Sequence, residues 1–232
     1  MISAVAVVIP ARDERQRIRA CLRAVHHTLS RLPDGIAHSV CVVADRCTDD
    51  TETLARTESP QAKIVTTKGD LPIGEVRDLG MRAARTALHG HLPTNTWLLS
   101  TDADTIVHRD WASSHVRLAD AGNDAIAGVA HLDRPAGPTR AAVVRYAAAV
   151  GRAHGPWGHG NVYGANLGIR ADAFDVVGGF GAVAVGEDHD LWTRLGNAGY
   201  TLLHADIPVV TSGRRIGRAL GGLADLLATL SD

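Results

Sequence analysis

A regular alternation of short apolar runs and amphipathic segments through the first hundred residues most constrains the fold. Residues 4–9 form a β-branched run that ends at Pro10, and apolar residues then recur at helical spacing from Ile18. The runs at 40–44, 63–67 and 97–100 repeat this order. Strands that alternate with helices predict an α/β fold with a Rossmann-like, mostly parallel central sheet and helices on both faces.

The second half of the chain alternates less regularly. Residues 155–168 are dense in glycine, which predicts a loop that lets the backbone approach a ligand closely, or a plain series of turns. No linker or repeat divides the chain, so we expect one domain, 1–232, with a nucleotide-binding half (1–104) and an acceptor-binding half (105–232) that ends in a C-terminal helix. The further elements expected are helices over 74–88, 111–121, 141–152, 172–177, 188–198 and 215–230, and strands over 125–131, 201–204 and 207–210.

Charge and composition exclude several classes of protein. The chain has 24 basic and 25 acidic side chains, a formal charge of −1, so it is not built as an electrostatic binder of nucleic acid. Its three cysteines show no C-x-x-C spacing, which favours a reducing compartment. The apolar run at the N-terminus stops at Pro10, too early for a signal peptide or a membrane span. We therefore expect a cytoplasmic protein.

The last stretch, 215–230, carries a leucine-rich stripe with arginines at its start. Packing in the core or in a homodimer is the favoured interpretation, because the basic residues cluster at one end instead of lining a polar face. A peripheral position at a membrane surface is the alternative.

Acidic residues follow two of the predicted strands where those strands end. Asp102 and Asp104 come directly after residues 97–100, and Asp45 ends the run at 40–44. In a parallel sheet the carboxyl ends of the strands meet at one edge, where ligands bind. Two carboxylates at i and i+2 can converge on one hard cation, Mg²⁺ or Mn²⁺, although a turn pair at the surface has the same spacing. Asp45 can accept a hydrogen bond from a base or orient a ribose, or it can simply favour a helix N-terminus.

A second acidic group begins a predicted helix. Glu187, Asp188 and Asp190 precede an apolar helical pattern. A carboxylate at this position can serve as a general base, and the alternative is capping of the helix.

These motifs together resemble the family 2 glycosyltransferases, which have the GT-A fold of the nucleotide-diphospho-sugar transferases. The resemblance spans residues 8 to 195 and keeps the family's order. It rests on Val8-Ile9-Pro10-Ala11-Arg12-Asp13-Glu14, Val42-Val43-Ala44-Asp45 with Thr48-Asp49-Asp50-Thr51, Arg77-Asp78-Leu79-Gly80, Asp102-Ala103-Asp104, Gly178-Gly179-Phe180, and Glu187-Asp188 with Asp190-Leu191 and Arg194-Leu195.

The resemblance implies a specific role for each group of these residues. Asp188 matches the catalytic carboxylate that takes the proton of the acceptor hydroxyl, with inversion at the anomeric carbon. Asp104 and Asp102 would bind the metal, and His189 or His204 is a candidate third ligand, as in related GT-A enzymes. The residues that would line the nucleotide and donor site are Pro10, Ala11, Arg12, Glu14, Asp45, Arg77, Asp102, Ala103 and Asp104.

Two further groups are expected around this site. Arg214 and Arg215 follow a strand and can hold the diphosphate as a flap, or merely begin an exposed helix. The residues that lie where the family places acceptor contacts are His159, Asn161, Ala165, Asn166 and Glu187.

The sequence departs from the family pattern in three places. Asp13 and Asp78 stand where the family has Asn, and Arg46-Cys47 replaces a small polar pair. These changes concern the contacts to the base.

We therefore expect transfer of a sugar from a nucleoside-diphosphate sugar, with UDP as the default, to the hydroxyl of a small molecule, lipid or natural product. Two other functions were weighed. A sugar nucleotidyltransferase would carry a glycine-rich basic loop after the first strand, which this chain lacks. A GT-A-like module that only binds a sugar nucleotide has no chemical need for Asp102, Asp104 and Asp188 together.

Overall fold

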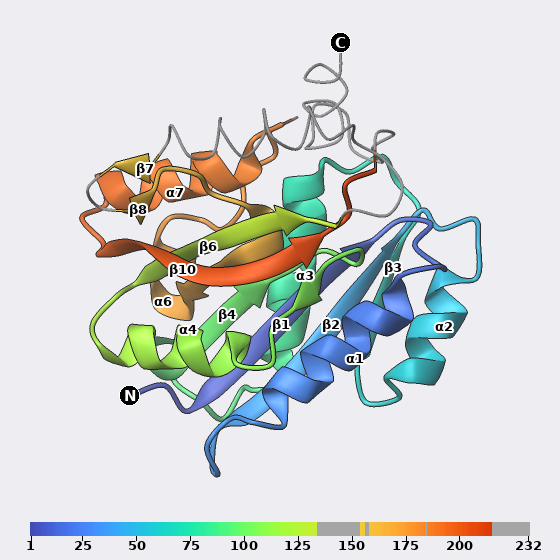
Figure 1. Ribbon diagram of the computed structural model, residues 1–232, viewed down its shortest axis with the longest axis horizontal. Coiled ribbons are helices and arrows are strands. Elements are labelled where there is room, and N and C mark those ends of the chain that lie inside the picture. The colour runs from blue at the N-terminus through green and yellow to red at the C-terminus, as the bar shows by residue number, and fades with distance from the viewer. Residues whose placement is uncertain (134–153, 156–157, 184, 215–232) are drawn as a thin grey trace.

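The computed structural model describes residues 1–133, 154–155, 158–183 and 185–214 of the chain (Figure 1). An eight-stranded sheet forms its centre, and strands from both halves of the chain take part in it. In spatial order the strands are β3 (Lys63–Thr67), β2 (Ala37–Asp45), β1 (Ala4–Ala11), β4 (Thr96–Ser100), β9 (Leu167–Arg170), β6 (Ala125–Leu132), β10 (Leu202–Thr211) and β5 (Ile106–Val107).

Most strands of the sheet point the same way. β3, β2, β1 and β4 are parallel neighbours, and β6 is parallel to β10. β9 runs antiparallel between β4 and β6, and β5 runs antiparallel at the edge beside β10. Because β9 is antiparallel to both β4 and β6, β6 runs in the same direction as β4. β10 is parallel to β6 and therefore ends at the same edge of the sheet as β1 and β4.

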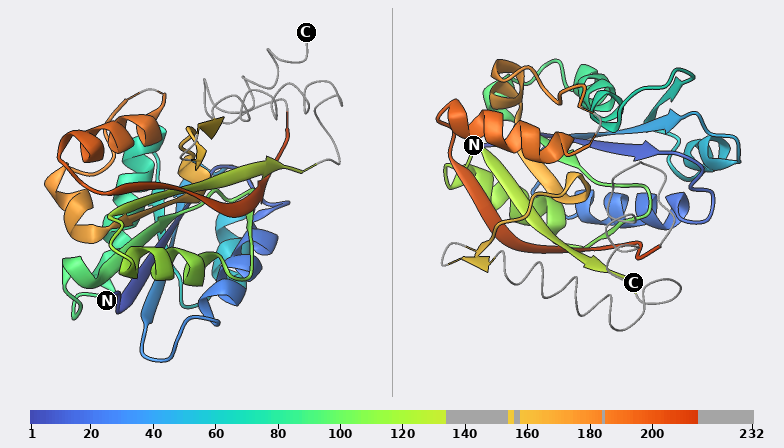
Figure 2. Two further views of the ribbon diagram at one scale, coloured as in Figure 1. Left: turned by 60° about the vertical axis from the view of Figure 1, so that its left-hand side comes forward. Right: turned by 90° about the horizontal axis from the view of Figure 1, so that it is seen from above.

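Helices cover both faces of the sheet (Figure 2, right). Alternate residues of β1 divide between the faces: Val5, Val7 and Ile9 pack with α1, whereas Ala6 and Val8 pack with α3. This alternation follows from the two-residue period of a strand. The helices on the first face are α1 (Ile18–Leu29), α2 (Thr51–Glu58) and α4 (Trp111–Asp120), and those on the second are α3 (Ile73–Thr86), α6 (Ala171–Val176) and α7 (Glu187–Asn197).

The predicted α/β class and the mostly parallel sheet are confirmed, and the local pattern missed only a few elements. The glycine-rich stretch contains the short strands β7 (His154–Gly155) and β8 (Gly158–His159), and β9 begins at its end. β9 was missed because its partners in β4 and β6 are far away in the sequence. The helices expected over 141–152 and 215–230 lie outside the described residues. Within the described part, no helix is both long and apolar enough to cross a membrane.

The two strands expected over 201–204 and 207–210 are one strand, β10, with an irregular register between His204 and Pro208. Proline has no N–H for the ladder, so the pairing with β6 is interrupted there. The Asn166 amide compensates, because its Nδ2 donates to the carbonyls of Val129 (3.0 Å) and Ile207 (2.8 Å). Asn166 lies in a short 3₁₀ turn, Gly164–Asn166, and therefore fixes this turn to β6 and β10.

A buried polar group extends from Asn166 into α4. Asn166 Oδ1 accepts a hydrogen bond from Trp111 Nε1 at 2.8 Å and lies 3.4 Å from His115 Nε2. Complete burial lowers the pKa of His115 to about 4, because the charged imidazolium would lose its hydration. The folded protein thus holds His115 neutral.

Protonation of His115 is expected to couple stability to pH. The unfolded imidazole binds a proton below pH 6.5 and the folded one only near pH 4, so this contribution to stability is complete above pH 6.5 and is lost as the pH falls toward 4. The free energy of unfolding from this group should fall by about 2 kcal/mol between pH 7.5 and pH 5. Urea unfolding of the wild type and of His115→Gln at both pH values measures it. An equal pH dependence in the two proteins would contradict the prediction.

Candidate active site

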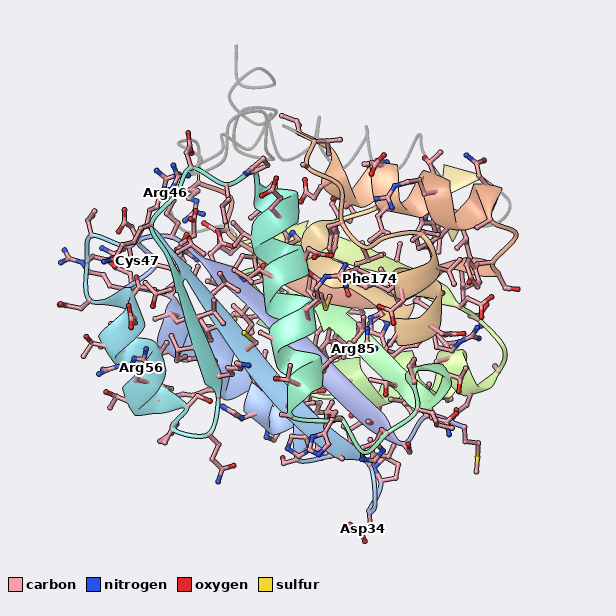
Figure 3. The ribbon with its side chains drawn as sticks, turned by 180° about the vertical axis from the view of Figure 1, so that it is seen from behind. Asp34, Arg46, Cys47, Arg56, Arg85 and Phe174 are labelled. Atoms are coloured by element: carbon pink, nitrogen blue, oxygen red, sulfur yellow. The ribbon has the colours of Figure 1, made fainter. Side chains whose placement is uncertain are left out.

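Most of the predicted nucleotide and metal residues lie at the edge of the sheet where β1, β2, β4 and β10 end. Figure 3 shows Arg46 and Cys47 at this edge, in the turn after β2, and Asp34 at the opposite end of the molecule. The loops at 12–14, 46–50, 101–105 and 212–214 surround the edge. The sheet therefore positions the acidic turns as the carboxyl-end rule predicts.

The Asp102-Ala103-Asp104 turn directs its two carboxylates away from the core. Ala103 is buried in the core between them, which anchors the turn. The Thr105 N–H donates to the Asp102 carbonyl at 3.0 Å, and the Cys21 thiol donates to the same oxygen at 3.3 Å. The Asp102 side chain is 31% exposed and that of Asp104 is 10% exposed.

The surroundings of Asp104 carry an excess of negative charge. Burial is the largest effect and raises the pKa of Asp104, and the nearby Asp102 and Glu14 carboxylates raise it further. An added cation would relieve both effects. Carboxylate oxygens of this kind are the ligands that Mg²⁺ and Mn²⁺ take, so the residues present fit a divalent cation.

Within the described residues, Arg214 is the basic residue that forms an ion pair with Asp104. Its Nη2 lies 3.0 Å from Asp104 Oδ2, and its Nη1 donates to Glu14 Oε1 at 2.5 Å. The guanidinium is thus paired with two carboxylates of the site in this structure, and its contact with a diphosphate stays a prediction. Arg215 lies outside the described residues.

Arg77 is buried behind the acidic turn and binds Asp102. It was expected near the base or the diphosphate, yet its side chain on α3 is only 5% exposed. The guanidinium donates to Asp102 Oδ1 (2.7 Å), Glu187 Oε1 (3.1 Å), Ser100 Oγ (2.9 Å) and the carbonyl of Gly164 (3.2 Å). With these acceptors in place, Arg77 supports the acidic turn, and its predicted position near the base or the diphosphate stays a prediction.

Gly164 connects Arg77 to the predicted base. Its carbonyl accepts from Arg77, and its N–H donates to Asp188 Oδ2 at 2.8 Å. A Cβ at this position would lie 2.6 Å from Arg77 Nη2, so only glycine allows the backbone to pass this close to the guanidinium. The second oxygen of Asp188 accepts the N–H of His189 at 2.8 Å. Backbone donors thus hold the carboxylate of Asp188 in one orientation.

The nucleotide pocket is expected between the ends of β1 and β2. Pro10 and Ala11 are the last residues of β1 and are buried, while Arg12 is half-buried in the turn that follows. Asp45 ends β2, and its Oδ1 accepts the Thr67 hydroxyl at 2.7 Å. The structure places these residues side by side at the ends of β1 and β2, and their contact with a nucleotide stays a prediction.

A tight packing of the two turns after β1 and β2 was not anticipated from the sequence. Asp13 and Arg46 have φ angles of 52° and 47°, in the left-handed region. Asp13 Oδ1 accepts the N–H of Thr48 at 2.7 Å and that of Asp49 at 3.3 Å, and the first of these is the main cause of a lowered Asp13 pKa. The aspartate that replaces the family's asparagine thereby fastens the two turns together. Ligand atoms of Asp13, Cys47 and Asp49 lie within 4.8 Å of one another.

The candidate third metal ligands lie apart from Asp104 or at the surface. His204 packs against Trp192, with 4.9 Å between ring centroids, near the start of β10. Thr211, beside Asp104, is roughly 20 Å further along the strand at about 3.3 Å per residue. The suggestion of His204 as a ligand is therefore wrong. His189 is exposed in the first turn of α7.

The predicted acceptor contacts divide into buried and accessible residues. Asn166 is completely buried in the structural network described above, and Glu187 is 9% exposed and paired with Arg77. Neighbouring residues occupy the amide of Asn166 and one carboxylate oxygen of Glu187, and contact of these two with an acceptor stays a prediction. Ala165 is buried, Asn161 is half-buried, and the backbone of His159 lies in β8.

Comparison with known proteins agrees with this geometry. Residues 6–178 match the family described as glycosyl transferase family 2. A mannosyltransferase, PcManGT from Pyrobaculum calidifontis, solved with GDP-Man and Mn²⁺, has a TM-score of 0.65 at 20% identity and matches 92% of this chain and 58% of its own. S. aureus TarS 1-349 with UDP-GlcNAc has a TM-score of 0.66 at 12% identity and matches 94% of this chain and 61% of its own. A mycobacterial protein has a TM-score of 0.58 at 19% identity and matches 96% of this chain and 69% of its own.

The fold is of the GT-A class, with a mostly parallel sheet whose carboxyl edge carries the acidic turns. The chain belongs to glycosyl transferase family 2. It spans about three fifths of the length of the mannosyltransferase and of TarS 1-349. No curated protein sequence matches it.

Removal of the Arg77 guanidinium should strongly destabilise the fold. Asp102 and Glu187 would lose their shared counter-ion, and breaking a buried ion pair from one side costs about 3–5 kcal/mol. Urea unfolding of Arg77→Ala measures the loss. Arg82→Ala is the matched control, because Arg82 lies on the same helix in an exposed pair with Asp78 and should change stability by less than about 1 kcal/mol. Equal stability of the two variants would refute the supporting role of Arg77.

Proposed function

We propose that the enzyme transfers a sugar from a UDP-sugar to an acceptor hydroxyl with inversion, using a divalent cation and Asp188 as the general base. The observation that carries this proposal is the link between Asp102 and Asp188. Arg77 binds Asp102 and the Gly164 carbonyl, and the Gly164 N–H binds Asp188. These hydrogen bonds keep Asp102 and Asp188 close together, which supports a single site for the cation and the base, as a single displacement at the anomeric carbon requires.

Recognition of the base is proposed for Asp45. Its Oδ1 accepts the Thr67 hydroxyl and lies 3.4 Å from Arg46 Nε, which leaves Oδ2 as the acceptor for a ligand. One free acceptor suits the single ring N–H of uracil better than the adjacent N–H groups of guanine. This argument favours UDP over GDP as the donor nucleotide.

Asp104 and Asp102 would hold Mg²⁺ or Mn²⁺. When bound, the cation supplies positive charge against the diphosphate that leaves. Asp102 Oδ1 accepts a hydrogen bond from Arg77, so Oδ2 would serve as the ligand to the cation. The loop after β1 would bind the nucleotide through Arg12 and the backbone of Pro10 and Ala11.

Asp188 would accept the proton of the acceptor hydroxyl. As that oxygen attacks the anomeric carbon, a new C–O bond forms on one face while the C–O bond to the diphosphate breaks on the other. The two backbone donors on Asp188 fix its orientation, and each oxygen retains a lone pair for the proton. The acceptor is proposed to be a small molecule, a lipid or a natural product that enters beside Asn161 and Ala165.

Replacement of the base should separate binding from turnover. Asp188→Asn removes the proton acceptor and should lower release of UDP from a UDP-sugar by about 10²–10⁴-fold, with nucleotide affinity unchanged. Asp190→Asn is the control, because Asp190 lies on the same helix but pairs with Arg194. Turnover of Asp188→Asn at the wild-type rate would remove the base assignment.

Nucleotide binding should depend on the cation. UDP with Mn²⁺ is expected to raise the melting temperature of the wild type, EDTA should abolish this rise, and Asp104→Asn should abolish it as well. Thermal-shift measurements with UDP, GDP and their sugars test the choice of base. A larger shift with GDP would contradict the argument from Asp45, and binding without any turnover would favour a module that only binds sugar nucleotides.

A further inference from the structure

Arg214 follows the end of β10 and contacts the Asp102-Ala103-Asp104 turn with its guanidinium. Its guanidinium bridges two carboxylates that come from different loops, Glu14 after β1 and Asp104 after β4. Both acceptors are at least nine-tenths buried, whereas the Arg214 side chain is 28% exposed. The bridge therefore joins three loops of the site at their most acidic point.

Backbone contacts hold this segment in place. The Gly213 N–H donates to Asp133 Oδ1 at 2.8 Å, and Asp133 also accepts from Arg17 Nη1 at 2.7 Å. The Thr211 hydroxyl lies 3.5 Å from Asp104 Oδ1. These contacts of Thr211 and Gly213 hold the segment in the position from which Arg214 reaches Asp104.

A guanidinium and a divalent cation need the same oxygen of Asp104. Nη2 lies 3.0 Å from Asp104 Oδ2, so a cation that takes this oxygen as a ligand would have to share it with the guanidinium. Two positive groups on one buried carboxylate repel each other, because the low local dielectric strengthens their interaction. Occupation by one disfavours the other.

We propose that Arg214 is a resident counter-ion of Asp104 that a divalent cation must displace before the donor diphosphate binds. This inference rests on the proposed cation site at Asp104. Arg214 neutralises the acidic turn while the cation is absent, and it lowers the apparent affinity for the cation. Once displaced, it is free to pair with the diphosphate, since a guanidinium binds phosphate oxygens well.

Direct titration of the metal tests the proposal without turnover. Electron paramagnetic resonance of free Mn²⁺ measures how much ion the purified full chain binds when no nucleotide is present. Arg214→Gln keeps a side chain of similar length but removes the charge, and it should bind Mn²⁺ about tenfold more tightly than the wild type. Arg214→Lys should fall between them, because a point charge replaces the bidentate fork.

Arg17→Gln is the matched control for charge alone. Arg17 also lies near the cluster and influences Asp104 from a distance, but its own partner is Asp133. Loss of Arg17 should tighten Mn²⁺ binding clearly less than loss of Arg214. In an Asp104→Asn background, Arg214→Gln should no longer tighten binding at all.

The outcomes separate the two proposals. Mn²⁺ binding that needs Asp104 but has the same affinity in Arg214→Gln and the wild type overturns the counter-ion role and leaves the cation site standing. Weaker binding in Arg214→Gln overturns it too, because Arg214 would then support the ion. If Arg17→Gln and Arg214→Gln tighten Mn²⁺ binding equally, the effect comes from the removal of any nearby positive charge. This outcome also overturns the counter-ion role of Arg214. Absence of Mn²⁺ binding in every variant overturns the cation site and the counter-ion role together.

Discussion

Much of the site depends on one buried guanidinium. The Arg77 side chain is almost completely buried, so its hydrogen bonds are made inside the protein, and its four acceptors come from three separate segments of the chain. The cost of burying the charge is offset only while Asp102 and Glu187 stay close to it. The acidic turn after β4 and the start of α7 are therefore held at fixed separation by an interaction that neither could make alone. Gly164, which passes over the guanidinium, extends this constraint to Asp188.

A second constraint comes from the irregular stretch of β10. Pro208 interrupts the ladder with β6, and the Asn166 amide satisfies carbonyls on both strands. The same short turn contains Gly164, so the repair of a defect in the sheet also fixes the residue that orients the predicted base. The antiparallel strand β9 follows directly and closes the gap between the two halves of the sheet. Sheet architecture and site geometry are thus set by the same few residues.

The fold was largely predictable because its signals are local. Apolar runs with β-branched residues and helical periodicity indicate strands and helices within a few residues of their true ends, and the parallel arrangement follows from their alternation. The positions of Asp45, Asp102 and Asp104 at one edge follow from the same rule. β9 was missed and β10 was predicted as two strands, since the pairing of both depends on partners that are distant in the sequence.

The sequence by itself determined the class of the protein, the order of its elements in the first half and the residue types that meet at the carboxyl edge. These properties depend on period, composition and motif, which are read along the chain. Only the tertiary structure decided what each charged or polar side chain does. Arg77 supports the site, Asn166 and Glu187 are internal, His204 is remote, and Arg214 pairs with Asp104. Burial and pairing decide these roles, because the free energy of a charge depends on which groups surround it, and the surroundings are assembled from segments far apart in the chain.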